Sequence, residues 1–401
     1  MKALLIHPGT QYSHRLAFQL NRVGYLYTFI TGIAFTKEAP FLKWMPGFLT
    51  SKIANRILDG SIKYNQLKTI PLPELRALFR LSRGGDMEEV LHQRNLTFQN
   101  KVPQHLLEKA DSVVGFDTSS WIIEERVEKL NKPYFLDQSI AHPREKERIY
   151  EQLRVRYPDW SEYIQPKNES SIYVEEREYA LARKVVVAST FTKNSLMRQN
   201  VPASKIVVNP YGVGNEFFRN KGKEKGSRKT RFLYLGLLGA RKGLPFLMEA
   251  WKEMELHREA ELWIAGPANS VALSAIENVP GVSYKGKVPY RDIPKLLDEC
   301  DCLVFPSFFE GFGQVILEAM AAGLPVITTE ATAGPDIIEH GKDGYLIKSG
   351  DKSDLCNLIK LLAGDRARCY EMGKAATEKA KSFSWEAYGD RWKEILNLER
   401  A

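Results

Sequence analysis

The sequence predicts a doubly wound α/β protein with two domains. Short apolar runs alternate with stretches of helical pattern over most of the chain, which is typical of parallel sheets covered by helices on both faces. The 401 residues are enough for two domains of ordinary size. Residues 220–230 are polar, charged and rich in lysine and glycine, as in an interdomain linker. We therefore predict domains at 1–219 and 231–383, followed by a terminal helix at 384–401.

The first domain contains six candidate strands. They are Lys2–Ile6, Tyr25–Ile30, Ser112–Phe116, Tyr134–Asp137, Lys184–Ala188 and Ile206–Asn209. Ligands of doubly wound sheets bind outside the carboxyl ends of the strands. Gly9 follows the first strand and His142 follows the fourth, so both lie where a ligand would approach. A plain turn glycine and a helix-capping histidine are the alternative interpretations.

Residues 35–75 form the least regular part of the first domain. Aromatic residues such as Trp44 are mixed there with lysines, and Pro71 and Pro73 mark its end. Such a mixture is typical of a segment that docks on a membrane interface or binds a lipid-linked acceptor. An insertion that packs its own aromatic residues is the alternative.

The second domain contains six further candidate strands. They are Arg231–Leu235, Glu261–Ala265, Val282–Lys285, Cys302–Phe305, Pro325–Thr329 and Tyr345–Lys348. A helix is predicted from Leu244 to Glu253, shortly after Arg241 and Lys242. Two cations at a helix N-terminus oppose the helix dipole, and a bound anion would remove the conflict. The pair therefore indicates a diphosphate site, with two ordinary surface cations as the alternative.

The stretch from Phe305 to Gly323 is the most informative part of the chain. Pro306 ends the apolar strand, and Gly311 and Gly313 allow a tight loop with exposed backbone amides. The helix predicted at 314–322 points its N-terminal amides at this loop, an arrangement that binds anions. The loop is therefore a second candidate for contact with a diphosphate.

Two glutamates flank the glycine loop. Glu310 precedes it, and Glu318 lies on the following helix among apolar neighbours. An ionised carboxylate buried there needs a polar partner. Because helical side chains lean toward the helix N-terminus, Glu318 is expected to reach back toward the bound anion and to accept hydrogen bonds from ribose hydroxyls. A solvated helix glutamate is the alternative.

This glutamate pair, with Gly-Phe-Gly between its members and Gly-Leu-Pro-Val-Ile after them, resembles the motif of retaining glycosyltransferases of family 4. The resemblance covers the second domain almost entirely and the first only loosely. It implies the GT-B fold, in which two Rossmann-like domains face each other across a cleft and the terminal helix crosses back to the first. In that family the first glutamate contacts the donor sugar and the second contacts the ribose, roles that fall to Glu310 and Glu318.

The resemblance implies the remaining site residues as well. The candidate catalytic residues are Glu310, Arg241, Lys242 and His142. The candidate donor-binding residues are Gly9, Gly236, Lys287, Val288, Gly311, Phe312, Gly313 and Glu318. The family usually carries an arginine directly after the glycine matched by Gly236, where this chain has Leu237, and we expect Arg241 to take its place.

These features predict a retaining, metal-independent glycosyltransferase. It would move a sugar from a nucleotide diphosphate sugar to a glycan or lipid-linked acceptor, in cell-surface polysaccharide or glycoconjugate synthesis. Fixed cations would stabilise the leaving diphosphate in place of a metal ion, and no aspartate-rich metal motif or further cofactor is expected. The alternatives are a GT-B epimerase or phosphorylase and a non-catalytic nucleotide-sugar-binding module.

Composition and sequence patterns argue against several other classes of protein. The net charge of +8 would suit nucleic acid, but no zinc-finger, RNA-binding or helix-turn-helix signature accompanies it, so no such partner is expected. The four cysteines show neither metal-ligand spacing nor a disulfide framework. No apolar run approaches the ~18–20 residues that cross a bilayer, and the N-terminus lacks a signal-peptide core. We expect a cytoplasmic protein with peripheral contact to an anionic membrane.

Overall fold

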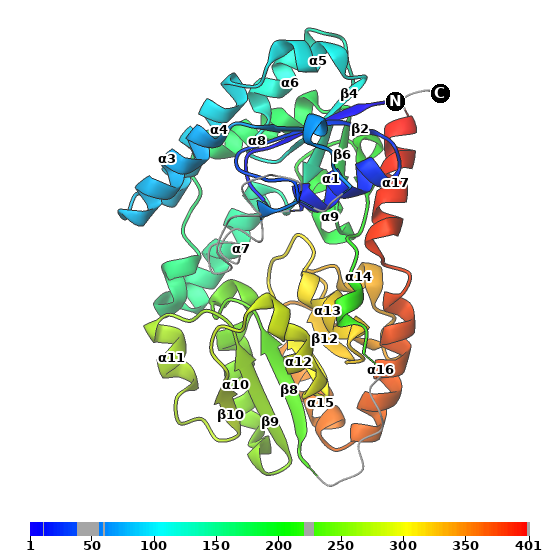
Figure 1. The fold of residues 1–401 in the computed structure, drawn as a ribbon. Coiled ribbons are helices and arrows are strands. Elements are labelled where there is room, and N and C mark those ends of the chain that lie inside the picture. Colours follow the sequence, from blue (N-terminus) through cyan, green and yellow to red (C-terminus); the bar gives the residue numbers. More distant parts are fainter. Residues whose placement is uncertain (11, 38–55, 59–60, 220–227, 399–401) are drawn as a thin grey trace.

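A computed structural model describes residues 1–10, 12–37, 56–58, 61–219 and 228–398. Figure 1 shows two lobes, each built around one parallel sheet. The first sheet has the strand order β3-β2-β1-β4-β5-β6-β7. Its strands are β1 (Ala3–His7), β2 (Leu26–Thr31), β3 (Leu67–Thr69), β4 (Ser112–Phe116), β5 (Tyr134–Gln138), β6 (Lys184–Val187) and β7 (Ile206–Val208).

The second sheet has six strands in the order β10-β9-β8-β11-β12-β13, again all parallel. They are β8 (Thr230–Leu235), β9 (Ala260–Ala265), β10 (Val282–Tyr284), β11 (Cys302–Phe305), β12 (Val326–Thr329) and β13 (Gly344–Ile347). The doubly wound α/β prediction is therefore confirmed for both lobes. Of the predicted linker, residues 220–227 lie outside the described residues.

Helices cover both faces of each sheet. The first lobe has α1 (Ser13–Arg22), α3 (Pro71–Ser82), α4 (Met87–Asn100), α5 (Gln104–Lys109), α6 (Trp121–Glu128), α7 (Pro143–Arg156), α8 (Glu169–Leu181) and α9 (Thr190–Arg198). The second has α10 (Leu244–Met254), α11 (Ser270–Ile276), α12 (Ile293–Asp298), α13 (Gln314–Ala321), α14 (Gly334–Ile337), α15 (Lys352–Ala363) and α16 (Arg366–Ala380).

The last helix, α17 (Trp385–Asn397), leaves the second lobe and packs against α1 of the first (Figure 1). Arg22 pairs with Asp390 at 2.5 Å between Nη2 and Oδ1. The two helices approach closely because Gly389 has no side chain: a Cβ there would lie 2.6 Å from Cβ of Gln19. The end of the chain therefore belongs to the same lobe as its beginning.

The predicted irregular segment at 35–75 is partly regular. It contains β3 and the start of α3, while residues 38–55, including Trp44, and 59–60 lie outside the described residues. Pro71 and Pro73 stand in the first turn of α3, where a missing amide hydrogen costs no helical hydrogen bond. The two prolines therefore begin a helix, although the sequence pattern predicted only the end of an irregular segment there.

Candidate functional site

Apart from His142, after β5, and Lys287 and Val288, after β10, the candidate residues of both lobes lie where the strand order of each sheet reverses. That point falls between β1 and β4 in the first sheet and between β8 and β11 in the second. Gly9 follows β1, Gly236 follows β8, and the loop 306–313 follows β11. The crevice at such a switch point is where doubly wound sheets bind ligands. The topology thus directs both halves of the candidate site to ligand-binding positions.

Glu310 is the centre of a buried ion-pair cluster. Its Oε1 lies 3.0 Å from Arg241 Nη1, pairs with Lys242 Nζ, and accepts a hydrogen bond of 2.8 Å from Ser307 Oγ. Arg241 also donates to the carbonyl oxygen of Phe309 at 2.7 Å. Burial alone would raise the pKa of Glu310, but Arg241 and Lys242 outweigh it and hold that pKa below its usual value. The ionised carboxylate therefore orders both cations beside the glycine loop.

Of the two cations, Lys242 has the pKa closer to neutral. Burial lowers its pKa to about 8, although the Glu310 carboxylate opposes the shift. The turn that carries Lys242 packs tightly against the loop 306–313. Gly243 has a φ of 77°, and a Cβ there would lie 2.1 Å from the carbonyl oxygen of Pro306. The turn with the two cations and the loop with Glu310 are therefore held in close contact.

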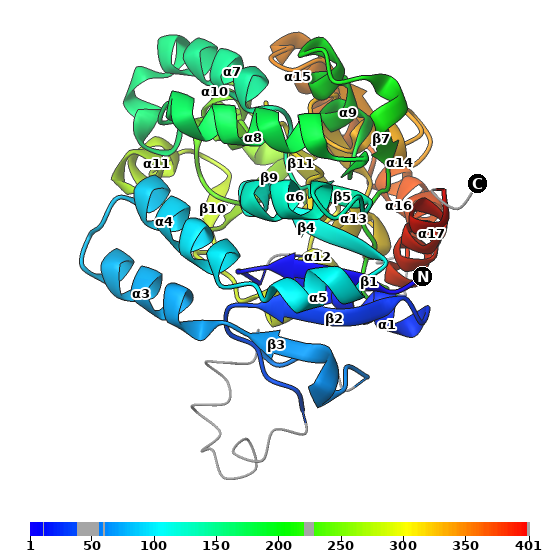
Figure 2. The same ribbon diagram turned by 90° about the horizontal axis from the view of Figure 1, so that it is seen from above.

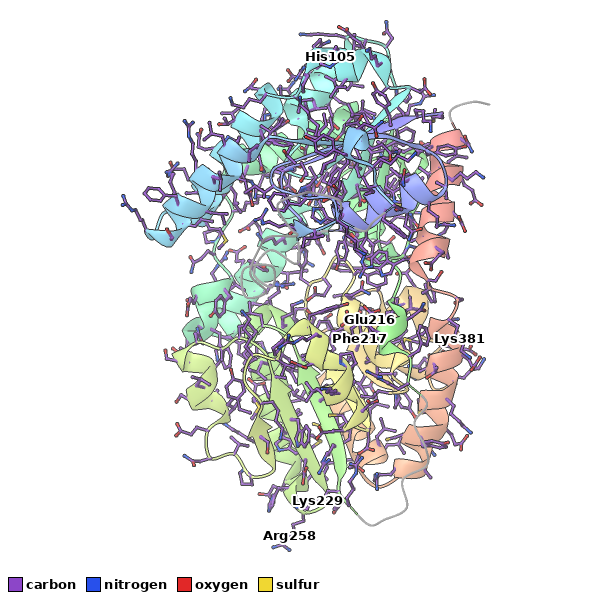
Figure 3. The ribbon with its side chains drawn as sticks, viewed as in Figure 1. His105, Glu216, Phe217, Lys229, Arg258 and Lys381 are labelled. Carbon is purple, nitrogen blue, oxygen red and sulfur yellow. The ribbon has the colours of Figure 1, made fainter. Side chains whose placement is uncertain are left out.

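Glu318 is buried on α13 and has a polar partner. The Tyr290 hydroxyl donates to its Oε1 at 3.1 Å, which meets the requirement that burial imposes on a carboxylate. Burial raises the pKa of Glu318 to about 7, opposed by the Tyr290 hydrogen bond and aided by the charge of Glu216. Glu216 lies near the middle of the molecule, close to the boundary between the lobes (Figure 3). A pKa of about 7 lets the Glu318 carboxyl group change its charge near neutral pH.

Tyr12 is a residue of the first lobe that lies near both glutamates. Burial raises its pKa to about 12, and the charges of Glu318 and Glu310 add to the rise, so its hydroxyl lies within their electrostatic reach. The Tyr12 ring stacks on Tyr211 at 4.0 Å, and Tyr211 meets Phe312 edge-on at 5.2 Å. Phe312 thus joins an aromatic cluster that connects the loop after β1 with the glycine loop.

The glycine loop is held against the first lobe. Ser189 Oγ and Thr192 Oγ1 donate to the carbonyl oxygen of Gly311 at 2.6 and 3.2 Å. A Cβ on Gly311 would lie 1.9 Å from the carbonyl oxygen of Ser139, so only glycine fits there. Gly313, with a φ of 84°, turns the chain into α13. The structure therefore gives Gly311 a role in the contact between lobes in addition to its predicted donor-binding role.

The other donor-binding candidates lie at strand ends. The Gly9 amide donates to His7 Nδ1 at 3.0 Å. Gly236 has a φ of 154° and packs closely on Gly266, after β9. Beyond β10, Lys287 is exposed and Val288 is half-buried against the core. Their contacts with a donor stay predictions.

His142 caps α7. Its Nδ1 accepts from the amide of Arg144 at 3.1 Å, and its own amide donates to Ser195 Oγ at 2.9 Å. The ring lies 5.2 Å from that of Tyr179, and burial lowers its pKa to about 4. The structure therefore shows the capping role that the sequence left open, and the catalytic role of His142 stays a prediction without support from its contacts.

Two buried carboxyl groups of the first lobe were missed as candidate site residues. Asp117, after β4, accepts from the amide and the hydroxyl of Ser139 at 3.2 and 2.9 Å. Asp137, on β5, accepts from the Tyr388 hydroxyl at 3.2 Å, and burial raises its pKa to about 8, with Asp117 adding to the rise. Their position at the ends of neighbouring strands is the signal that would have identified them.

The site thus combines two cations, two carboxyl groups with opposite pKa shifts and a helix N-terminus. Cations and backbone amides can hold a diphosphate, and a carboxylate can accept hydrogen bonds from sugar hydroxyls. Across the described ranges, no group of three or more histidine, cysteine, aspartate or glutamate side chains is placed to hold a metal ion. None of the helices in those ranges has the length and apolar character needed to span a bilayer.

Comparison with solved structures identifies the fold class. The chain superposes on HepE of Anabaena, described in complex with UDP, with a TM-score of 0.65 and 16% identity over 99% of this chain and 100% of that one. It superposes on sucrose-phosphate synthase of Thermosynechococcus elongatus with a TM-score of 0.66 and 18% identity over 99% of each chain. The chain therefore has the GT-B fold.

Sequence comparisons add the family. Residues 229–365 match the model described as glycosyl transferases group 1. The sulfoquinovosyl transferase of Arabidopsis thaliana is 28% identical over 52% of this chain and 41% of its own length. The O-antigen chain mannosyltransferase B of Escherichia coli is 27% identical over 51% of this chain and 58% of its own. The chain thus spans about half the length of these relatives. The match to the group 1 glycosyltransferase model lies in its second lobe, which confirms the family 4-like resemblance.

Proposed function

We propose that the chain is a retaining, metal-independent glycosyltransferase that uses a nucleotide diphosphate sugar. The observation that carries the proposal is the cluster of Glu310, Arg241 and Lys242 at the switch point of the second sheet. The cluster stands beside α13, and the charge of Glu318 on that helix influences Tyr12 of the first lobe. The donor's diphosphate meets the cations and the amides at the start of α13, and its ribose hydroxyls donate to Glu318.

Negative charge grows on the diphosphate as the glycosidic bond breaks. Arg241 and Lys242 are already oriented by Glu310, so they stabilise this charge without reorganising, which is the role a metal ion plays in other sugar transferases. Retention requires the acceptor to arrive on the face from which the diphosphate leaves. We assign that approach to the loop of the first lobe that carries Gly9, next to Tyr12, whose hydroxyl is influenced by the charges of both glutamates.

The acceptor is a glycan or a lipid-linked sugar. Support comes from the relatives, which are named for O-antigen, amylovoran and sulfoquinovosyl transfer. The product is a cell-surface polysaccharide or glycoconjugate, and a lipid-linked acceptor places the protein at an anionic membrane surface. The first donors to test are UDP sugars, because HepE is described with UDP and UDP-glucose.

The decisive experiment follows one reaction in EDTA. With an α-linked donor of gluco configuration, selected by a thermal-shift panel of UDP, GDP, ADP and dTDP sugars, the protein is expected to form an α-linked product at the rate seen without chelator. The anomeric proton coupling of the product reports the linkage. A β-linked product contradicts retention, and loss of turnover in EDTA, restored by added Mg²⁺ or Mn²⁺, contradicts metal independence.

Donor affinity is expected to be highest between about pH 7 and pH 8. Below about 7, Glu318 gains a proton and becomes a poorer acceptor for ribose hydroxyls. Above about 8, Lys242 loses its proton and its attraction for the diphosphate. Each limb falls by up to about tenfold in affinity per pH unit, since one proton is linked to binding. Calorimetry with the nucleotide sugar and no acceptor measures both limbs. Glu318→Gln should flatten the acid limb alone; equal affinity from pH 6 to 9 in the wild type contradicts both assignments.

A further inference from the structure

Helix α3 turns an apolar side outward. Leu72, Leu75, Leu78 and Phe79 are 44%, 52%, 46% and 56% exposed, which is unusual for four large apolar side chains within two turns of a helix. The inward side of α3 is formed by Pro73, Glu74 and Ala77, which are buried. In Figure 2, α3 and α4 lie side by side at the rim of the first lobe, with α3 outermost.

The outward side of α3 is also cationic. Arg76, Arg80 and Arg83 are exposed next to the apolar side chains, and the Arg83 guanidinium lies 4.2 Å from the centre of the Phe79 ring. The single acid of this helix, Glu74, is buried and pairs with Arg56 and Arg94. The exposed surface therefore combines leucine, phenylalanine and arginine without an acidic residue of its own helix.

The base of α3 is anchored to the loop that is predicted to face the acceptor. Arg94 pairs with Glu74 at 3.2 Å, and its Nη1 lies 3.9 Å from the position of a Cβ on Gly9. Gly32 is confined between the two segments: a Cβ there would lie 3.2 Å from Glu74 Cβ and 2.5 Å from the carbonyl oxygen of Pro8. The orientation of α3 is therefore fixed relative to the first-lobe side of the candidate site.

We propose that the outward face of α3, formed by Leu72, Leu75, Arg76, Leu78, Phe79, Arg80 and Arg83, docks on an anionic lipid bilayer. The leucines and Phe79 enter the interface, and Arg76 and Arg83 contact lipid phosphates, while Arg80 also pairs with Glu89 of α4. Helices of this composition bind through buried apolar area together with attraction to anionic lipid. This inference rests on the proposed function, in which the acceptor is linked to a lipid. It deepens that proposal, because docking through α3 places the bilayer that carries the acceptor beside the Gly9 loop.

Vesicle flotation of the whole chain tests the proposal with two double variants. Arg76→Gln with Arg83→Gln should lower partitioning into vesicles of phosphatidylglycerol and phosphatidylcholine by about 25-fold at low salt, at about fivefold for each arginine. Its partitioning into pure phosphatidylcholine should change little. Leu75→Gln with Phe79→Gln should lower partitioning into both vesicle types by at least about tenfold, because it removes buried apolar area. Arg80 is left in place because it pairs with Glu89 of α4.

The matched control is Arg258→Gln with Leu273→Gln in the second lobe. Leu273 is 41% exposed, and Arg258 lies at the end of the molecule opposite His105 of the first lobe (Figure 3). This variant should float like the wild type. The proposal is overturned by a wild type that stays out of the floating fraction, by α3 variants that float equally well, or by self-association that only the apolar variant abolishes. Donor binding, measured on the same proteins, is expected to be unchanged; its absence from the wild type would refute the proposed function and leave the docking result standing.

Discussion

Lys242→Ala is expected to slow turnover by about 2–4 kcal/mol of activation free energy, with a smaller change in KM for the donor. Lys242 attracts the diphosphate of the bound donor, and this attraction strengthens as negative charge grows during departure, so its loss is expected to affect kcat more than donor binding. The remaining cluster stays intact, because Glu310 keeps Arg241 at 3.0 Å and Ser307 at 2.8 Å. Arg241→Ala should slow turnover by a similar amount and also loosen the loop, since Arg241 holds the Phe309 carbonyl oxygen.

Lys285→Ala is the control for a lysine of the same lobe. Lys285 lies over the Trp263 ring at 3.5 Å and is exposed, outside the cluster around Glu310. Steady-state kinetics of the three variants, with thermal unfolding to verify folding, separate the roles. If both Lys242→Ala and Arg241→Ala kept the wild-type kcat, the proposal that these two cations stabilise the leaving diphosphate would be refuted, whatever the stability of the variants.

Gly311→Ala is expected to disturb the junction of the lobes. The added Cβ would meet the Ser139 carbonyl oxygen at 1.9 Å and the Ile140 Cα at 3.0 Å, and neither is the end of a flexible side chain. The glycine loop must therefore retreat, and the hydrogen bonds from Ser189 and Thr192 lengthen. Overpacking of this kind costs about 1–3 kcal/mol of stability. Misplacing the first lobe over the donor is expected to cost turnover on the order of 100-fold.

Gly364→Ala separates this effect from a general cost of replacing glycine. Gly364 has a φ of −80° and only the Lys360 carbonyl oxygen near its Cβ position, at 3.9 Å, so alanine fits. Melting temperature and kcat should match the wild type in this control and fall in Gly311→Ala. A Gly311→Ala protein that keeps both values would show that the contact with Ser139 does not fix the lobes.

The strands of the second lobe are predictable because their signal is local. Cys302–Phe305 is an apolar run bounded by Pro306, and its predicted range agrees with β11. The glutamate motif likewise occupies one continuous stretch, so its spacing could be recognised in the sequence. Gly323, which follows α13 with a φ of 80°, likewise ends the helix through a local signal, because glycine adopts this backbone conformation readily.

The partners of those residues come from elsewhere in the chain, and sequence spacing does not reveal them. Tyr290 donates a hydrogen bond to Glu318 although α12 and β11 separate the two residues in the sequence. Ser139 contacts Gly311 from the other lobe. His142 shows the converse: a histidine after a strand fits both a ligand contact and a helix cap. Only the position of the Arg144 amide shows that capping is the role its ring performs.

The packing of α17 on α1 has a consequence for the order of synthesis. The first lobe begins at β1 but lacks one of its covering helices until Trp385–Asn397 has left the ribosome. The strands and helices described for the second lobe lie between Thr230 and Ala380, so that lobe can reach its final packing earlier. Nascent chains usually complete their N-terminal domain first. Here we expect that order to be reversed, with the surface around Gln19 open to chaperones until Gly389 has left the ribosome.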